Sequence, residues 1–292
     1  LGALTYAFRH VAAVDRPRGG SGMLSTAIAS AFTANGGVLR TSTAVSSIIV
    51  DSGRIRGVRT SNGDTIMSRV VVSAADPRRT ILDWVQNPPT SAGPMIERWK
   101  SAQHQQGYES KIDGIIDEVP RYRQVDHSVF DRLGINPAVA STMIVPTVAE
   151  MHDAFLRIAD GTIAERPILF ANVPTVLDPT MAPAGRHVFS LEALFTPYAL
   201  RGGWRGSNEP RRWLDQYSTL LTNRPIDSMT QWRAMTPDVY ESDFHMPEGH
   251  ATSFAGGPLA ALRGEPRELV RYETSIPGLF LCGAATFPGA GI

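Results

Sequence analysis

The sequence predicts a mixed α/β (α+β) protein with two parts, and three observations lead to this prediction. Residues 19–85 show the order helix, strand, strand, hairpin, strand, helix. The tripeptide Asn87-Pro88-Pro89 marks a change in composition, after which the periodic patterns are less regular through residue 264. Near the end, the apolar run Leu279–Cys282 predicts a short buried strand that opens into glycines.

Composition narrows the class of protein. Of 292 residues, 42% are hydrophobic and 19% charged, which is enough apolar material for a sizeable core. The formal net charge of zero argues against nucleic acid or an anionic membrane surface as the main partner. Cys282 is the only cysteine, so the sequence predicts no internal disulfide and a reducing, cytoplasmic location. No apolar run approaches the roughly 18 residues that a membrane-spanning helix needs.

The first part begins with an expected helix over residues 22–34, with Ser21 as N-cap and an apolar face formed by Leu24, Ile28, Ala31 and Phe32. Asn62-Gly63 is a strong hairpin signal. Asp76 and Pro77 predict the start of a second helix that runs to about residue 85. Strands are expected at residues 38–40, 43–50, 55–60 and 65–73.

The middle of the chain mixes helix and strand patterns. Helices are expected at residues 94–102, 147–159 and 209–222, the second with Val148, Met151, Phe155 and Ile158 facing inward. Residues 244–262 are rich in Gly, Pro, Ala and His and predict a loop. The aromatic residues between 195 and 232 fit either core packing or the wall of an apolar substrate pocket. Strands are expected at residues 111–119, 142–145, 168–173, 187–195 and 228–235.

No single motif identifies a cofactor, a metal site or a catalytic residue by itself. The run Arg18-Gly19-Gly20-Ser21-Gly22 could cradle a phosphate, but by itself it favours an ordinary turn before a helix. Cys282 lies in an apolar strand and predicts a buried, inert thiol. His245 and His250 lack the acidic or cysteine partners of a metal site, so we expect no metal. No Gly-x-Ser-x-Gly elbow occurs, and the sequence identifies no catalytic residue.

Six stretches of the sequence are more specific together than any one of them alone. They are Pro17–Ser25, Gly36–Ile48, Val71–Pro77, Ser190–Trp204, Thr274–Ala284 and Pro288–Gly291. Together they resemble the phytoene-desaturase-like flavoproteins of the amine-oxidase superfamily, in the branch that contains the carotenoid desaturases, the retinol saturases and the pyridine nucleotide-disulphide oxidoreductase domain-containing protein 2 group. The resemblance is collinear and covers nearly the whole chain.

The resemblance implies a Rossmann-like domain for FAD and a substrate domain with a mixed or antiparallel sheet. Residues 1–86 and 265–292 would form the discontinuous FAD-binding domain, and residues 87–264 the substrate domain. Val45 would contact the adenine through its backbone. The other implied FAD contacts are Ala74 and Ala75 near the adenosine and pyrophosphate, Gly283 and Ala284 near the pyrophosphate and ribitol, Gly289, Ala290 and Gly291 near the isoalloxazine, and Arg18, Gly19, Gly20 and Gly22 at the domain junction.

Two departures from the family pattern matter. The family's first βαβ unit, with its G-x-G-x-x-G turn, does not occur in residues 1–292, so we expect the sequence to be part of a longer protein. A histidine-containing run expected near the flavin is also altered, because Gly249-His250 is followed by Ala251-Thr252-Ser253-Phe254. A histidine catalyst at that place is therefore not predicted.

The functional prediction is an FAD-dependent oxidoreductase that moves a hydride between flavin and a small lipophilic substrate of isoprenoid or polyene type. Two alternatives remain open: a non-enzymatic lipid-binding or interaction protein that keeps the fold, and a flavin amine oxidase. The expected partner is the lipophilic substrate, without nucleic acid, and peripheral membrane contact stays open. The sequence predicts no oligomeric state.

We expect residues 1–292 to hold FAD weakly and to be inactive by themselves, because the resemblance places most diphosphate contacts in the βαβ unit outside this sequence. The visible spectrum of the purified chain measures the retained flavin. A tightly bound, stoichiometric yellow flavin would contradict this expectation.

Overall fold

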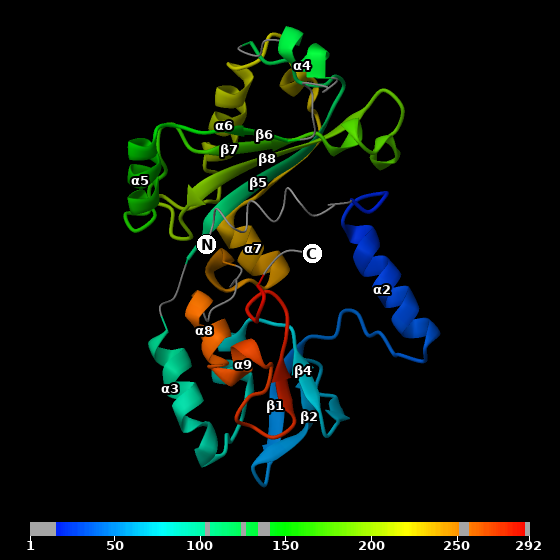
Figure 1. Ribbon diagram of the computed structural model, residues 1–292, viewed down its shortest axis with the longest axis vertical. Coiled ribbons are helices and arrows are strands. Elements are labelled where there is room, and N and C mark those ends of the chain that lie inside the picture. Colours follow the sequence, from blue (N-terminus) through cyan, green and yellow to red (C-terminus); the bar gives the residue numbers. More distant parts are fainter. Residues whose placement is uncertain (1–15, 103–105, 124–126, 134–140, 251–256, 290–292) are drawn as a thin grey trace.

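The computed structural model describes residues 16–102, 106–123, 127–133, 141–250 and 257–289, and it has the predicted mixed α/β architecture. Two small sheets lie in one half of the molecule and a five-stranded sheet in the other (Figure 1). No helix in the described part of the chain is long and apolar enough to cross a membrane.

The first half contains two short sheets that meet at one core. Strands β1 (Val45–Asp51), β2 (Arg54–Thr60) and β3 (Thr65–Met67) form an antiparallel sheet. Strand β4 (Val71–Ser73) instead pairs in parallel with β10 (Leu279–Leu281). The core between them is apolar and includes Ile48, Ile55, Ile81, Ile276, Leu279 and Leu281.

Helical segments close this core. Asp76 Oδ1 accepts hydrogen bonds from the amides of Arg78 and Arg79 at 2.9 and 3.1 Å, which confirms the predicted cap before η1 (Arg79–Trp84). Helix α3 (Gly93–Ser101) adds Met95 and Trp99 to the same core. The predicted division at residues 86 and 87 stays a prediction, although the core around β1 extends past it through η2 (Thr90–Ala92) into α3. Helices α8 (Gly257–Arg263) and α9 (Arg267–Val270) precede β10.

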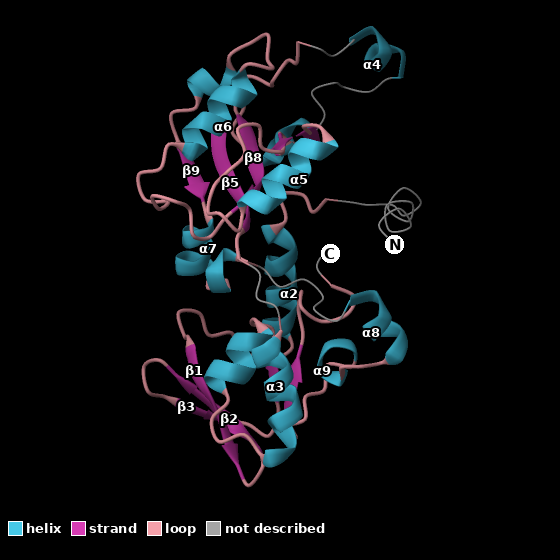
Figure 2. Cartoon of the chain, turned by 90° about the vertical axis from the view of Figure 1, so that its left-hand side faces the viewer, coloured by secondary structure: helices cyan, strands magenta, loops and turns pink. Residues whose placement is uncertain are grey.

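The second half is built on an antiparallel sheet in the order β6-β7-β8-β5-β9. Its strands are β6 (Ser141–Ile144), β7 (Leu169–Asn172), β8 (His187–Thr196), β5 (Tyr108–Ile116) and β9 (Trp232–Met235). Helix α6 (Glu209–Ser218) lies along one face of the sheet (Figure 2), where its Trp213, Leu214 and Tyr217 are fully buried.

Shorter elements connect these strands. Helix α4 (His127–Leu133) follows β5, and α5 (Val148–Arg157) follows β6. Helix α7 (Pro237–Phe244) lies beneath β5, between the two halves (Figure 1). The remaining single turns of helix are η3 (Pro174–Val176), η4 (Pro179–Met181), η5 (Pro225–Ser228) and η6 (Pro247–Gly249).

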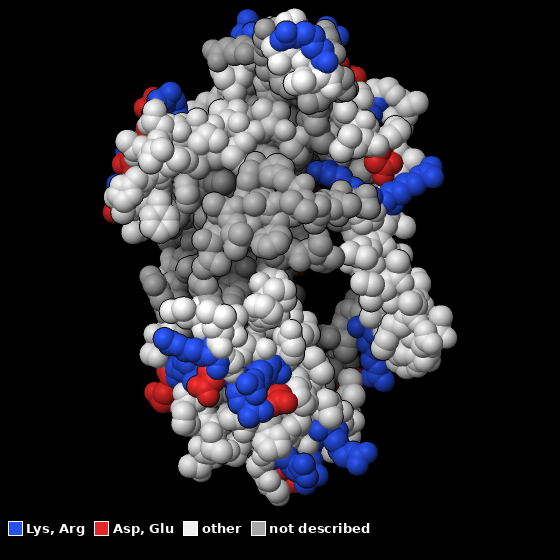
Figure 3. All heavy atoms as spheres, in the orientation of Figure 1, with Lys and Arg blue, Asp and Glu red and all other residues white. Residues whose placement is uncertain are grey.

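Helix α2 (Gly22–Ala34) has the predicted bounds, and its apolar face is exposed. None of its residues is buried, and Ile28 and Phe32 are 61% and 52% exposed. Ser21 makes no side-chain cap hydrogen bond. The helix contains no charged residue and stands as an uncharged column beside the rest of the chain (Figure 3).

Further expectations are corrected by tertiary contacts. The expected strand at 38–40 is absent, and Val38 is 74% exposed without a neighbouring strand. The expected strand 65–73 is divided into β3 and β4, because a turn held by Ser68 Oγ and the carbonyl of Val70 sends them to different sheets. The expected loop 244–262 contains η6 and α8.

In helix α5, too, the hydrophobic spacing did not predict which side chains are buried. The predicted inward face is wrong, because Val148 and Phe155 are exposed and Ala154 is the buried residue. The helix nevertheless begins with a complete capping box between Thr147 and Glu150. This motif needs only hydrogen bonds between residues at the helix start, so it forms without any tertiary contact.

An ion pair between a buried carboxylate and a partly exposed guanidinium joins α3 to α9. Arg98 Nη2 lies 2.5 Å from Glu268 Oε1, and the side chains are 45% and 4% exposed, respectively. Trp99 Nε1 donates a second hydrogen bond to the same oxygen at 3.3 Å. The carboxylate of Glu268 therefore depends on these two donors for its place in the core.

We expect Arg98→Met to lower the free energy of unfolding by about 2–3 kcal/mol, because it leaves a buried carboxylate without its cation. The matched control is Lys100→Met, which breaks the exposed pair with Glu97 and should cost less than about 1 kcal/mol. Chemical denaturation measures both. Equal losses in the two variants would contradict the importance of the buried pair.

Candidate functional site

The carboxyl ends of two parallel strands meet at one place. Strand β4 ends at Ser73 and continues into Ala74-Ala75, and β10 ends at Leu281 and continues into Cys282. The amide of Cys282 donates to the carbonyl of Ser73 at 2.8 Å, which keeps the two chains together beyond the last paired residues. Ligands of α/β proteins bind outside the carboxyl ends of such strands.

Gly283 allows the two chains to lie close together. Its φ is +91°, and a Cβ placed on it would lie 3.3 Å from the carbonyl oxygen of Ala74. Any larger residue would need a strained backbone at this place. A turn follows, in which the amide of Thr286 donates to the carbonyl of Gly283 at 3.1 Å. The result is a strip of small residues with accessible backbone.

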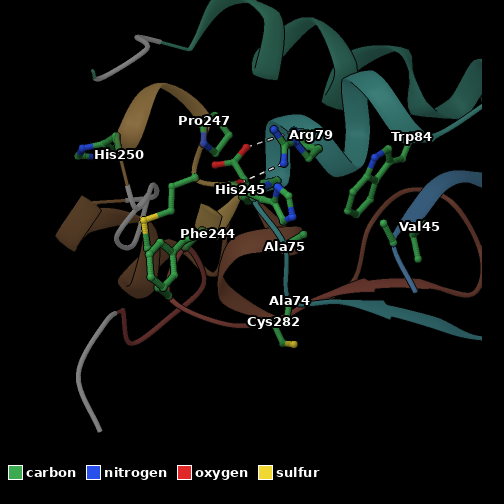
Figure 4. A pocket seen from close by; sticks show the side chains of 16 residues that line it. Val45, Ala74, Ala75, Arg79, Trp84, Phe244, His245, Pro247, His250 and Cys282 are labelled. Carbon is green, nitrogen blue, oxygen red and sulfur yellow. Dashed lines mark hydrogen bonds between the residues drawn. The ribbon is translucent and has the colours of Figure 1, made fainter. Parts of the chain in front are cut away.

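A cavity of about 520 Å³ opens onto this strip. That volume is in the range of sites for small molecules and parts of cofactors. Figure 4 shows Val45, Ala74, Ala75 and Cys282 on one side, and Phe244, His245, Pro247 and His250 on the other. The remaining residues that line the cavity are Ala44, Asp76, Pro77, Arg79, Trp84, Met246, Ala284 and Ala285.

The second wall of the cavity comes from the end of α7. His245 has a φ of 57°, which turns the chain out of the helix into η6. Arg79 Nη1 donates to the carbonyl of His245 at 3.0 Å and so connects the two walls (Figure 4). His250 Nδ1 lies 2.9 Å from the carbonyl of Gly107, which fixes the chain after η6. The guanidinium of Arg79 is a cation that lines this largely apolar cavity.

Glu241 supports this wall from the neighbouring turn of α7. Its Oε1 accepts the amide of Glu248 at 2.9 Å, and its Oε2 accepts the hydroxyl of Tyr198. The hydrogen bond from Tyr198 and then that from Glu248 lower the pKa of Glu241 below its ordinary value. The same hydrogen bond to Glu241 raises the pKa of Tyr198 to about 12.

The predicted cofactor residues divide into three groups. Val45, Ala74, Ala75 and Ala284 line the cavity, and Gly283 lies between two residues that do. Arg18, Gly19, Gly20, Gly22 and Gly289 do not line it. Ala290 and Gly291 lie outside the described residues. The role of all these residues in FAD binding stays a prediction.

The glycine-rich run before α2 has a different contact. The amide of Gly19 donates to Asp178 Oδ2 at 2.6 Å, and a Cβ on Gly20 would lie 3.2 Å from Met181 Cε. A hydrogen bond from Thr180, followed by that from Gly19, lowers the pKa of Asp178. The run therefore contacts the loop around η4 in the second half.

Sequence reasoning missed most of the far wall. Phe244, His245, Met246 and Pro247 were expected in a loop, and no pattern placed them opposite Ala75. Arg79 was overlooked, although it follows the capping residue Asp76 directly. Cys282 is half-buried and lines the cavity, so the expectation of a fully buried thiol is wrong. It lies one residue past the end of the strand, where the backbone opens toward the cavity.

Comparison with known proteins agrees with this geometry. Residues 3–100 match the model of the family described as flavin containing amine oxidoreductase. Over these residues the chain is similar to the flavin-containing amine oxidoreductases. The family resemblance predicted from the sequence is thereby confirmed.

Three relatives describe the extent of the likeness. Pyridine nucleotide-disulfide oxidoreductase domain-containing protein 2 of Rattus norvegicus is 29% identical over 94% of this chain and 48% of its own length. The phytoene desaturase (neurosporene-forming) of Cereibacter sphaeroides is 26% identical over 94% of this chain and 50% of its own length. An oxidoreductase from Methanosarcina mazei shares the fold with a TM-score of 0.55 and 15% identity, over 92% of this chain and 50% of that one.

The chain thus spans about half the length of the curated relatives it matches. The family is flavin-containing, which confirms FAD as the predicted cofactor. The cavity fits this group in three respects. Gly283 admits a close backbone approach, the side chains along the strip are small, and Arg79 supplies a positive charge for an anionic group.

We expect Tyr198→Phe to raise the pKa of Glu241 toward the ordinary value, because the largest hydrogen bond that lowers it is lost. Since the pKa of Glu241 is lowered in the fold, its contribution to stability is present above the unfolded pKa and is lost as the pH falls through the folded pKa. The pKa of Tyr198 is raised, so its contribution is present below the ordinary tyrosine pKa and is lost as the pH rises toward about 12.

A pH titration of the glutamate carboxyl signals by NMR measures the shift. Tyr272→Phe is the matched control, because the hydroxyl of Tyr272 donates to the carbonyl of Phe287 instead. An unchanged pKa of Glu241 in Tyr198→Phe would show that the hydrogen bond does not hold its charge.

Proposed function

We propose that the chain forms part of an FAD-dependent oxidoreductase that moves a hydride between flavin and a lipophilic substrate. The observation that carries the proposal is the cavity at the carboxyl ends of β4 and β10, with small residues on one wall and apolar side chains on the other. The family match and the relatives support the flavin.

Each wall has a separate task in this proposal. Ala74, Ala75 and Ala284 leave their backbone open to a large planar ligand, and Gly283 keeps the strip narrow. Arg79 is placed to contact the diphosphate, since a guanidinium suits phosphate oxygens. The start of β1 at Val45 offers backbone groups to the adenine.

The second wall adds apolar surface to the site. Phe244, Met246 and Pro247 present apolar groups to the cavity, opposite the small residues. FAD, when bound, supplies the hydride chemistry, and the chain contributes binding, orientation and a low-dielectric surrounding. A lipophilic substrate agrees with these walls, because apolar side chains recognise apolar surface.

We expect Ala75→Leu to weaken FAD binding about fivefold to a hundredfold, because the added side chain fills the space beside the strip, and overpacking of this kind costs about 1–3 kcal/mol. Titration of the chain with FAD, followed by quenching of flavin fluorescence, measures the affinity. The matched control is Ala184→Leu, which adds the same side chain to an exposed turn. Equal affinities for the two variants would place FAD elsewhere.

The redox part has its own test. The experiment uses the longer flavoprotein of which the chain is proposed to form part. After reconstitution of that protein with FAD, lipophilic compounds are added without oxygen, and the loss of the oxidised-flavin absorbance is followed. Reduction by a polyene or isoprenoid compound supports the proposal. FAD binding without reduction by any lipophilic compound would instead support a lipid-binding protein that keeps the fold.

A further inference from the structure

Trp84 places an aromatic ring at one end of the cavity. It is the last residue of η1 and lines the cavity next to Val45 (Figure 4). Its side chain is half-buried and packs in part against the core around Ile48 and Ile81. Its indole N–H makes no hydrogen bond within the described part of the chain, although a buried indole N–H usually finds an acceptor. The ring is therefore held by packing and remains open toward the cavity.

An unusual helix brings Trp84 to this place. Segment η1 is a π-helix, in which the amide of Val85 donates to the carbonyl of Thr80 at 3.2 Å, five positions earlier. Helices of this type are rare and occur frequently at functional sites. The chain after Trp84 is then fixed beside β1, where the amide of Gln86 donates to the carbonyl of Ile48 at 3.3 Å. The wide turn and this contact together determine where the indole lies.

The start of β1 presents backbone beside the indole. The pairing of β1 with β2 is irregular between Val45 and Ser47, where the register shifts. Ala44 and Val45 line the cavity at this point. Irregular pairing of this kind leaves strand residues unpaired and is common next to active sites. A planar group placed on Trp84 would thus have polar backbone beside it as well as an aromatic face.

Three kinds of chemistry follow one another along the cavity (Figure 4). The indole of Trp84 lies at one end, and Phe244 with His250 lies at the other. The guanidinium of Arg79 lies between them. This order of aromatic ring, cation and apolar wall matches a ligand that carries a planar base, then phosphate, then a larger planar group. FAD has an adenine, a diphosphate and an isoalloxazine in the same order.

We propose that Trp84 stacks against the adenine ring of FAD and thereby positions the adenosine half of the cofactor. Stacking on an aromatic side chain is a general means of binding a nucleobase, because every base has an aromatic face. With the adenine on Trp84, the phosphates extend toward Arg79 and the isoalloxazine toward Phe244. The inference rests on the proposed function, because it assigns one end of the same cavity.

The test uses three probes that separate the parts of FAD: AMP, FMN and ribose 5-phosphate. Calorimetric titration of the 292-residue chain measures their affinities. We expect AMP to bind about tenfold more tightly than ribose 5-phosphate, since a base stacked on an aromatic side chain contributes this much. Equal binding of AMP and ribose 5-phosphate would overturn the proposal, and so would a failure of AMP to bind.

Substitutions of Trp84 locate the stacked ring. Trp84→Leu should remove most of the difference between AMP and ribose 5-phosphate, whereas Trp84→Phe should keep part of it because a phenyl ring still stacks. The affinity for FMN should be the same in both variants. Trp232→Leu is the matched control, because Trp232 lies partly exposed on the edge strand β9 and does not line the cavity.

Two outcomes would contradict the assignment to adenine. Equal affinities for AMP in Trp84→Leu and Trp232→Leu would show that the base does not lie on Trp84. A loss of affinity for FMN in Trp84→Leu, with the affinity for AMP unchanged, would place the flavin ring there instead. Far-ultraviolet circular dichroism shows whether the variants keep the fold, and the comparison of probes on the unaltered chain needs no variant.

Tryptophan fluorescence gives a second readout. A stacked adenine quenches the emission of an indole, so AMP should lower the emission of the unaltered chain and of Trp232→Leu. The emission of Trp84→Leu should not respond to AMP. Quenching that persists in Trp84→Leu would show that the base lies against another tryptophan.

The result is separable from that of the proposed function. AMP contains no flavin, so stacking on Trp84 can be found where no lipophilic compound reduces the flavin. Conversely, FAD binding that depends on Ala75 but not on Trp84 would support the cofactor site and overturn this inference alone.

Discussion

The parallel pairing of β4 with β10 is the contact on which the candidate site depends. It joins residues 71–73 to residues 279–281, with Leu279 opposite Val71 and Leu281 opposite Ser73. Leu279 and Leu281 are buried in the same core as Ile48 and Ile55, so the pairing is held by apolar packing as well as by hydrogen bonds. Because the strands are parallel, their small-residue continuations leave the sheet on the same side. This pairing is what brings Ala75 and Ala284 to the same cavity.

Helix α7 lies between the two halves of the molecule and connects the five-stranded sheet to the cavity. The charges of Glu109, Glu192 and Asp113 on the five-stranded sheet act on its Tyr240, while Phe244 and the turn at His245 line the cavity. The hydrogen bond from Arg79 to the carbonyl of His245 connects this turn to the first half. The cavity is therefore made of two walls from different parts of the fold. Its lining is largely apolar and includes the guanidinium of Arg79 and the carboxylate of Asp76.

Much of the local structure could be predicted, because it depends on interactions between residues that are close together in the sequence. Asp76 caps its helix and Thr147 forms a capping box with Glu150, because hydrogen bonds at a helix start involve residues only two or three positions apart. Burial was harder to predict. Ile28 and Phe32 have the spacing of a buried face yet are exposed on α2, and in α5 Ala154 is buried instead of Phe155. Periodicity shows which residues share a face but not what covers that face.

The sequence by itself determined the mixed α/β class, the bounds of α2, the flavoprotein resemblance and the small residues of the strip. These properties depend on residue type and short-range spacing. Only the tertiary structure decided that Phe244 and Met246 lie opposite that strip, and that Arg79 connects the two walls through its hydrogen bond to the carbonyl of His245. Contacts of this kind join residues from distant parts of the chain, and they form through the register of the strands and the packing of α7, which no short pattern contains.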